Sequence, residues 1–133
     1  MRAVFADTSY SVALLNPGDE FHLQAREQTE AIAGQLITTE WVLLELANYL
    51  RKTENRHLFV ALYEDLNSDG RVSIIPASSE QFEEGVARYK DRSDKDWSLT
   101  DCISFLEMER NEVTVSLTVD HHFEQAGFTI LLK

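Results

Sequence analysis

The chain has 133 residues, 44% of them hydrophobic, which suits one globular domain spanning 1–133 with a single core. No apolar run approaches the roughly 20 residues that a membrane-spanning helix needs, and the lone cysteine, Cys102, excludes an internal disulfide framework and a cysteine-ligated zinc site. We therefore expect a soluble, cytoplasmic protein without a membrane segment.

The formal net charge of -11 at pH 7 argues against an ordinary nucleic-acid-binding protein, which usually carries a basic surface. This objection loses weight where acids cluster around a metal ion, because the charge of the ion neutralises them locally. A protein with a strongly negative net charge is also suited to bind a positively charged partner. The charge is therefore informative about partners and only weakly informative about chemistry.

Short β-prone runs alternate with helical patterns along the whole chain. The predicted strands cover 2–6, 36–38, 72–75, 113–118 and 128–132. The predicted helices cover 9–15, about 19–33, 40–53, 55–66, 80–90, 99–110 and a single turn at 123–126. This alternation predicts an α/β fold in which a parallel β-sheet is flanked by helices on both faces.

Capping residues set several of the predicted helix boundaries. Asp19 is expected to cap the helix over 19–33, which ends at Gly34. Ser79 is expected to cap the helix over 80–90. These boundaries are predicted to within several residues.

Four carboxylates stand near the predicted ends of strands or on the helices that follow them. Asp7 directly follows the first strand, and Asp120 comes two residues after the strand over 113–118. Asp101 lies in the first turn of its helix, and Glu45 lies within its helix among largely apolar neighbours, where a carboxylate is costly unless it is paired or ligated. Because ligands bind at the carboxyl ends of parallel strands, we expect these side chains to share one crevice.

Acids that converge on one crevice repel each other, and a hard divalent cation is the usual resolution. Mg²⁺ and Mn²⁺ prefer oxygen ligands, and Mg²⁺ also binds phosphate oxygens. Such a site can polarise a phosphodiester and activate water. The pattern therefore favours metal-assisted phosphodiester hydrolysis, with Asp7, Glu45, Asp101 and Asp120 as catalytic and metal-binding residues.

Each acid also has a purely structural interpretation. Asp101 can complete a capping box with Ser98, and Asp120 can start a turn. Glu45 can be a partly exposed helix residue that pairs with a nearby basic side chain. Asp7 is the hardest to explain structurally, because the strand before it is otherwise apolar.

The residues also match the motifs of a known family over nearly the whole chain. The order, spacing and total length of these motifs are specific when taken together. The motifs are Asp7-Thr8-Ser9, the segment from Thr39 to Leu46, Ser98-Leu99-Thr100-Asp101-Cys102, and the segment from Thr118 to Phe128. The chain resembles a PIN-domain protein and, more narrowly, the VapC-type toxins of type II toxin–antitoxin pairs.

The resemblance implies a parallel sheet sandwiched by helices, and an endoribonuclease that depends on Mg²⁺ or, in its place, on Mn²⁺. It implies that Asp7, Glu45, Asp101 and Asp120 correspond to the family's acidic quartet, with Asp7 and Asp101 as the firmest ligands. It also implies a homodimer that is inhibited by a small cognate antitoxin. A PIN-fold module that binds RNA or protein without cleaving it, through a degenerate metal site, remains the alternative.

Two other groups of residues are candidates for contact with a ligand. His121 and His122 follow Asp120, but we favour a solvated turn over zinc ligation, because adjacent side chains diverge and no second His or Cys cluster supports them. Basic residues that flank the acids in sequence are candidates for contact with RNA phosphates, with a solvated helix face as the alternative. They are Arg51, Lys52, Arg92 and Lys95.

Overall fold

A computed structural model describes residues 3–133, and within them strands and helices alternate as the sequence predicts. The strands are β1 (Val4–Ala6), β2 (Leu36–Thr39), β3 (Val72–Ile75), β4 (Val115–Leu117) and β5 (Thr129–Ile130). The helices are α1 (Thr8–Leu15), α2 (His22–Ala31), α3 (Glu40–Tyr49), α4 (Arg56–Ser68), α5 (Ser79–Asp91), α6 (Leu99–Arg110) and α7 (His121–Gln125).

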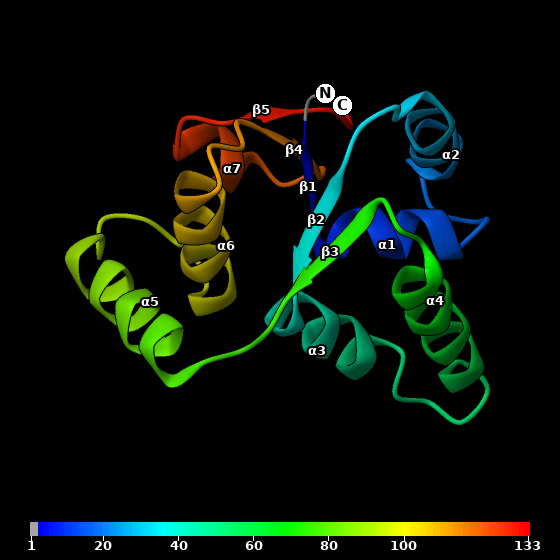
Figure 1. Cartoon of the computed structure of the whole chain (residues 1–133), viewed down its shortest axis with the longest axis horizontal. Coiled ribbons are helices and arrows are strands. Elements are labelled where there is room, and N and C mark those ends of the chain that lie inside the picture. The colour runs from blue at the N-terminus through cyan, green and yellow to red at the C-terminus, as the bar shows by residue number, and fades with distance from the viewer. Residues whose placement is uncertain (1–2) are drawn as a thin grey trace.

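The strands form one sheet in the order β3-β2-β1-β4-β5, and every pairing in it is parallel. Figure 1 shows α5, α6 and α7 on one side of this sheet and α1, α2 and α4 on the other. The predicted α/β class, with a parallel sheet between two layers of helices, is confirmed.

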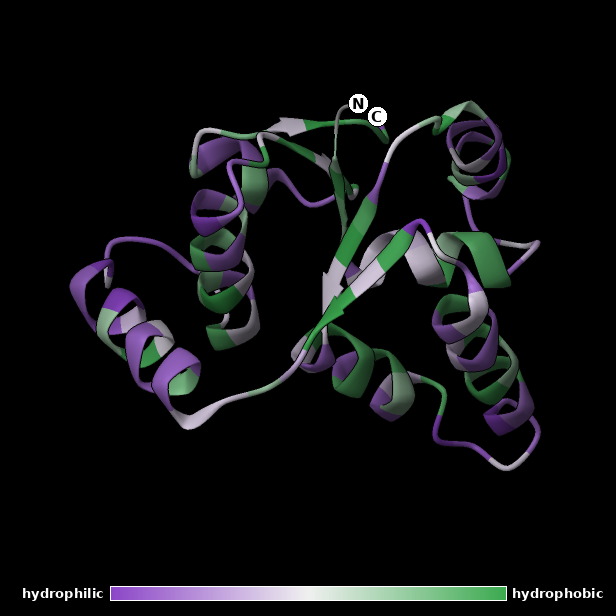
Figure 2. Ribbon diagram, in the orientation of Figure 1, coloured by the Kyte–Doolittle hydropathy of each residue, from purple (hydrophilic) through white to green (hydrophobic). Residues whose placement is uncertain are grey.

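Alternate residues of the central strand β1 supply the two halves of the core. Phe5 packs on the α6 side, where its ring centroid lies 6.4 Å from that of Phe123, and Phe123 meets Phe105 edge-on at 4.9 Å. Val4 and Ala6 belong to the cluster on the α1 and α2 side. Figure 2 shows hydrophobic strands between helices of mixed polarity, as expected for a sheet that is buried on both faces.

Two helix starts differ from the prediction. The Oδ1 atom of Asp19 accepts the backbone N–H of Phe21 at 2.8 Å and so makes a local turn, and α2 begins only at His22. The cap of α5 is Ser78, whose Oγ accepts the N–H of Gln81 at 3.1 Å. Where two serines stand together, the sequence does not show which one has the extended backbone that a cap requires.

Other boundaries are shorter than predicted. The helix predicted over 40–53 ends at Tyr49, because the chain turns there toward α4, and the N–H of Asn55 bonds to the carbonyl of Lys52. The strands predicted over 113–118 and 128–132 shorten to β4 and β5. Of the strand predicted over 2–6, position 2 lies outside the described residues.

The strand order reverses between β1 and β4, which are neighbours in the sheet. The next strand after β1, β2, lies toward one edge of the sheet, and the next strand after β4, β5, lies toward the other edge. In parallel sheets, the crevice at such a point is where ligands bind. Within residues 3–133, no helix has the length and hydropathy needed to cross a membrane.

Candidate metal centre

Asp7 occupies the first position after β1, at the crevice. Its backbone N–H donates to the carbonyl of Leu117 at 3.1 Å, which ties it to the end of β4. Its carboxylate is buried, and Oδ2 accepts a hydrogen bond from Oγ1 of Thr118 at 2.9 Å. Burial raises the pKa of Asp7 to about 7, with smaller contributions from the charges of Asp101 and Glu45, while the Thr118 hydrogen bond opposes the rise.

Small hydroxyl residues connect the loop after β4 to the start of α1. Ser9 Oγ and Thr118 Oγ1 lie 3.0 Å apart. Ser9 Oγ accepts the N–H of Val119 at 3.1 Å, and Thr118 Oγ1 accepts the N–H of Asp120 at 3.0 Å. The position of Asp120 is therefore linked through this network to that of Asp7.

Asp101 completes the capping box that its sequence context suggests, and it also reaches the crevice. Its Oδ2 accepts the N–H of Ser98 at 3.1 Å, and its own N–H donates to Ser98 Oγ at 3.0 Å, which completes a capping box at the start of α6. Its carboxylate also lies in the crevice. Burial raises its pKa and the charge of Asp120 adds to this, while the Ser98 backbone and His122 oppose it.

Asp120 is likewise a helix-capping residue that lies at the crevice. It is the N-cap of α7, where its Oδ1 accepts the N–H of His122 at 2.9 Å. The turn interpretation is therefore confirmed. The same carboxylate faces the crevice.

Glu45 reaches the crevice from the middle of α3, but its surroundings differ from the prediction. Its side chain is exposed and accepts a hydrogen bond from Thr8 Oγ1. The expectation that apolar neighbours make this carboxylate costly is wrong, because the side chain is exposed to solvent. Glu40, in the same helix, serves a different purpose and accepts the N–H of Ala77 at 2.6 Å.

All four predicted acids line one cleft of about 580 Å³. Three more acids stand in its wall, namely Asp19, Glu20 and Asp96. Among its lining residues in the described part of the chain there is no lysine or arginine to balance them. Carboxylates with no lysine or arginine to neutralise them, two of them with a raised pKa, form a donor set that fits a hard divalent cation.

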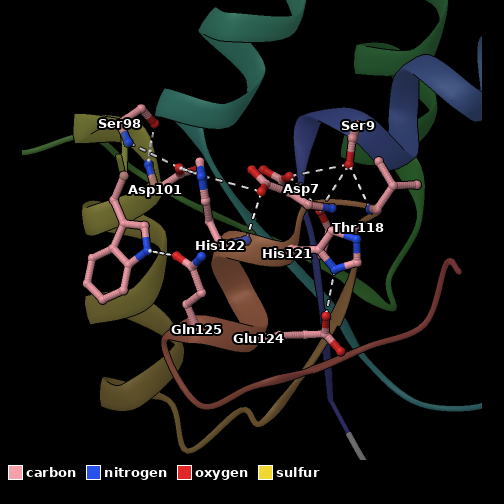
Figure 3. A network of polar contacts seen from close by, with 12 residues as sticks. Asp7, Ser9, Ser98, Asp101, Thr118, His121, His122, Glu124 and Gln125 are labelled. Atoms are coloured by element: carbon pink, nitrogen blue, oxygen red, sulfur yellow. Dashed lines mark hydrogen bonds and ion pairs between the residues drawn. The ribbon is translucent and has the colours of Figure 1, made fainter. Parts of the chain in front are cut away.

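The cleft also holds His122, for which the sequence favours a solvated turn. His122 Nδ1 lies 3.2 Å from Asp101 Oδ2 and 3.3 Å from Asp120 Oδ1. His121 is exposed and turns away to pair with Glu124 at 2.7 Å (Figure 3). Successive residues of a helical turn point about 100° apart, so only one of the two histidines faces the cleft, and the sequence alone does not tell which.

The four basic candidates all lie outside the lining of this cleft. Arg92 pairs with Asp94 at 3.1 Å and lies over the ring of Trp97 at 4.8 Å, and Lys95 Nζ is 4.0 Å from Asp94. Arg51 and Lys52 follow α3 and are exposed, with Arg51 donating to the carbonyl of Asn48 at 3.3 Å.

Comparison with known proteins identifies relatives of the same length. The family model described as "PIN domain" matches residues 4–129. The 23S rRNA-specific endonuclease VapC20 of Mycobacterium tuberculosis is 30% identical over 127 residues, which cover 94% of this chain and 95% of the relative.

Solved structures share the fold over the same extent. The crystal structure of M. tuberculosis VapC20, described as a Sarcin-Ricin loop cleaving toxin, has a TM-score of 0.86 and 23% identity, and covers 95% of this chain and 96% of its own. DNA-bound VapBC from Salmonella typhimurium has a TM-score of 0.70 and 15% identity over 98% of this chain and 97% of its own. The chain therefore belongs to the PIN domain family, among its VapC-type members.

Proposed function

We propose that this protein is a metal-dependent endoribonuclease that acts as the toxin of a toxin–antitoxin pair. The observation that carries the proposal is the convergence of Asp7, Glu45, Asp101 and Asp120 on one cleft that has no lysine or arginine in its described lining. The name of the relative, a 23S rRNA-specific endonuclease, supports RNA as the substrate.

The four acids have graded roles in this proposal. Asp7 and Asp101, the most buried of the set, hold Mg²⁺, or Mn²⁺ in its place, while Glu45 and Asp120 complete the site from its more exposed side. The ion, when bound, supplies the positive charge that polarises a phosphodiester and lowers the pKa of a water.

Neighbouring residues of the chain prepare the carboxylates for this task. Thr118 fixes the direction of the Asp7 carboxylate through Oδ2, and Thr8 does the same for Glu45 through Oε1. Because the pKa of Asp7 is about 7, this group gives up its proton near neutral pH when a cation enters.

The substrate is proposed to be ribosomal RNA. The 30% identical relative is named for 23S rRNA, and the solved structure with the TM-score of 0.86 is described as cleaving the Sarcin-Ricin loop. Contact with RNA phosphates is assigned to Arg51, Lys52, Arg92 and Lys95, of which only the last two already pair with Asp94.

The proposal includes partners and a location. A small antitoxin would bind this chain, as supported by fold neighbours described as VapBC and FitAcB. We expect the chain to form a homodimer and to be located in the cytoplasm.

The test is cleavage of RNA that contains the Sarcin-Ricin sequence by purified, antitoxin-free protein, in Mg²⁺, in Mn²⁺ and in EDTA. We expect cleavage with either ion and none in EDTA. The double variant Asp7→Asn, Asp101→Asn should be inactive. Glu124→Gln, which removes an exposed acid outside the cleft, should keep wild-type activity.

Equal cleavage with and without a divalent ion would contradict the proposal, as would an active double variant. Metal binding without any cleavage would support the alternative, a PIN-fold module that binds RNA or protein without turnover.

A further inference from the structure

His122 is the only nitrogen donor among the described residues that line the acidic cleft. Its Nδ1 atom and one carboxylate oxygen each from Asp101 and Asp120 lie within 4.8 Å of one another. These residues come from the start of α6 and from α7, which meet at the carboxyl edge of the sheet. A nitrogen therefore stands among the oxygens that are proposed to bind the cation.

Nδ1 of His122 makes a long hydrogen bond to Asp101, and its distances to both carboxylates are close to those between two ligands of one cation. Nδ1 lies 3.2 Å from Asp101 Oδ2 and 3.3 Å from Asp120 Oδ1. Charge-assisted N–H···O bonds are shorter, at about 2.7–2.9 Å. Two ligands at adjacent octahedral positions, each about 2.1 Å from an ion, lie about 3.0 Å apart. The two distances from Nδ1 are therefore compatible with a cation shared by His122 and these carboxylates.

The short helix α7 holds the imidazole in this place. Phe123, the next residue, is fully buried against Phe105, and Gln125 accepts a hydrogen bond of 3.0 Å from Trp97 Nε1. The backbone N–H of His122 is itself bound by Asp120. With the helix anchored on both sides, the ring keeps its direction toward Asp101, as Figure 3 shows.

We propose that His122 is a direct ligand of the catalytic cation, so that the site has a mixed nitrogen and oxygen donor set. This inference rests on the proposed function, since it assigns a further ligand to the same site. Imidazole suits Mn²⁺ and the later transition ions better than Mg²⁺, which prefers oxygen. The site therefore prefers Mn²⁺ to Mg²⁺ more strongly than four carboxylates alone would.

The test is pulsed EPR of Mn²⁺ bound to the tag-free protein, which detects magnetic coupling to a directly bound nitrogen. We expect this coupling in the wild type and in His121→Ala, whose side chain lies outside the cleft. It should be lost in His122→Ala. Calorimetry should show that His122→Ala weakens Mn²⁺ binding by about tenfold or more and weakens Mg²⁺ binding less.

Absence of nitrogen coupling in the wild type would overturn the inference without recourse to any variant, as would coupling that persists in His122→Ala. These outcomes are separate from the test of the proposed function. A protein that cleaves RNA with a divalent ion but shows no nitrogen coupling refutes only the role of His122. Nitrogen coupling without cleavage refutes only the nuclease.

Discussion

Oγ1 of Thr118 donates a hydrogen bond of 2.9 Å to Oδ2 of Asp7, and so joins the residue after β4 to the residue after β1. This bond opposes the effect of burial on the pKa of Asp7. Thr118→Val keeps the shape of the side chain but removes the donor, so the pKa of Asp7 in the metal-free protein should rise above its present value of about 7.

A carboxyl-detected NMR titration of Asp7 measures this pKa directly. Thr114→Val, at an exposed position just before β4, is the matched control and should leave it unchanged. An unchanged Asp7 pKa in Thr118→Val would show that the hydrogen bond does not stabilise the ionised carboxylate.

The raised pKa of Asp7 predicts how stability depends on pH without metal. The value is 3.8 in an unperturbed chain and about 7 in the folded protein, so between these pH values the folded state holds a proton that the unfolded state has released. The contribution of Asp7 to the free energy of unfolding is therefore fully present below pH 3.8 and is lost as pH rises through about 7. Each unit of difference between the folded and the unfolded pKa corresponds to about 1.4 kcal/mol of unfolding free energy.

Asp7→Asn should therefore stabilise the metal-free protein at pH well above the Asp7 pKa, because the amide is neutral at every pH. As pH falls from about 7 toward 3.8 the advantage should shrink, and below pH 3.8 it should vanish, because the wild-type carboxyl is then protonated in both the folded and the unfolded states. Thermal melts in EDTA at the two pH values test this. A variant that is less stable than the wild type by the same amount at both would contradict the assigned pKa.

Substitutions of two glutamates in α3 should have different effects, one on cleavage activity and the other on the stability of the fold. Glu45→Gln alters an exposed side chain, so the free energy of unfolding should change by less than about 0.5 kcal/mol, while the cleavage rate should fall by about tenfold or more. Glu40→Ala removes the acceptor for the Ala77 N–H and should cost about 1 kcal/mol with cleavage intact. Chemical denaturation and RNA cleavage measure the two effects, and the opposite pattern would exchange the roles of the two acids.

Removing the basic residues after α3 should weaken RNA binding through phosphate contacts. In an Asp7→Asn background that prevents cleavage, Arg51→Gln with Lys52→Gln should reduce the salt slope of binding by about 1.4, at about 0.7 for each contact. Arg92→Gln with Lys95→Gln should reduce it less, because Asp94 already pairs with both side chains. Fluorescence anisotropy of labelled RNA across a salt series measures the salt slope of each double variant. Equal reductions in the two variants would contradict the prediction.

The sequence predicted the sheet and the cleft because both depend on patterns that are local in the chain. Hydrophobic periodicity located the five strands, and the position of Asp7 and Asp120 after two of them followed from that alone. The sequence predicts Asp101 as a capping residue, and the cap also places its side chain in the cleft, because α6 starts at the crevice.

Tertiary contacts explain what the sequence did not predict. The neighbours of Glu45 along α3 are apolar, but the sequence does not indicate which side of the helix the core covers, and this side chain is exposed. The choice between His121 and His122 depends on how Phe123 anchors α7, which is a long-range contact with Phe105. The adjacent serines at the start of α5 are equivalent until the backbone angles are known.

Sequencing of RNA ends after induced expression tests most directly whether the carboxylates of this cleft are needed to cleave RNA. Wild-type protein should create new ends at one defined position, in ribosomal RNA if the substrate assignment is correct. Asp7→Asn, expressed at the same level, should create none. The same new ends in cells that express Asp7→Asn, or no new ends with the wild type, would contradict the account.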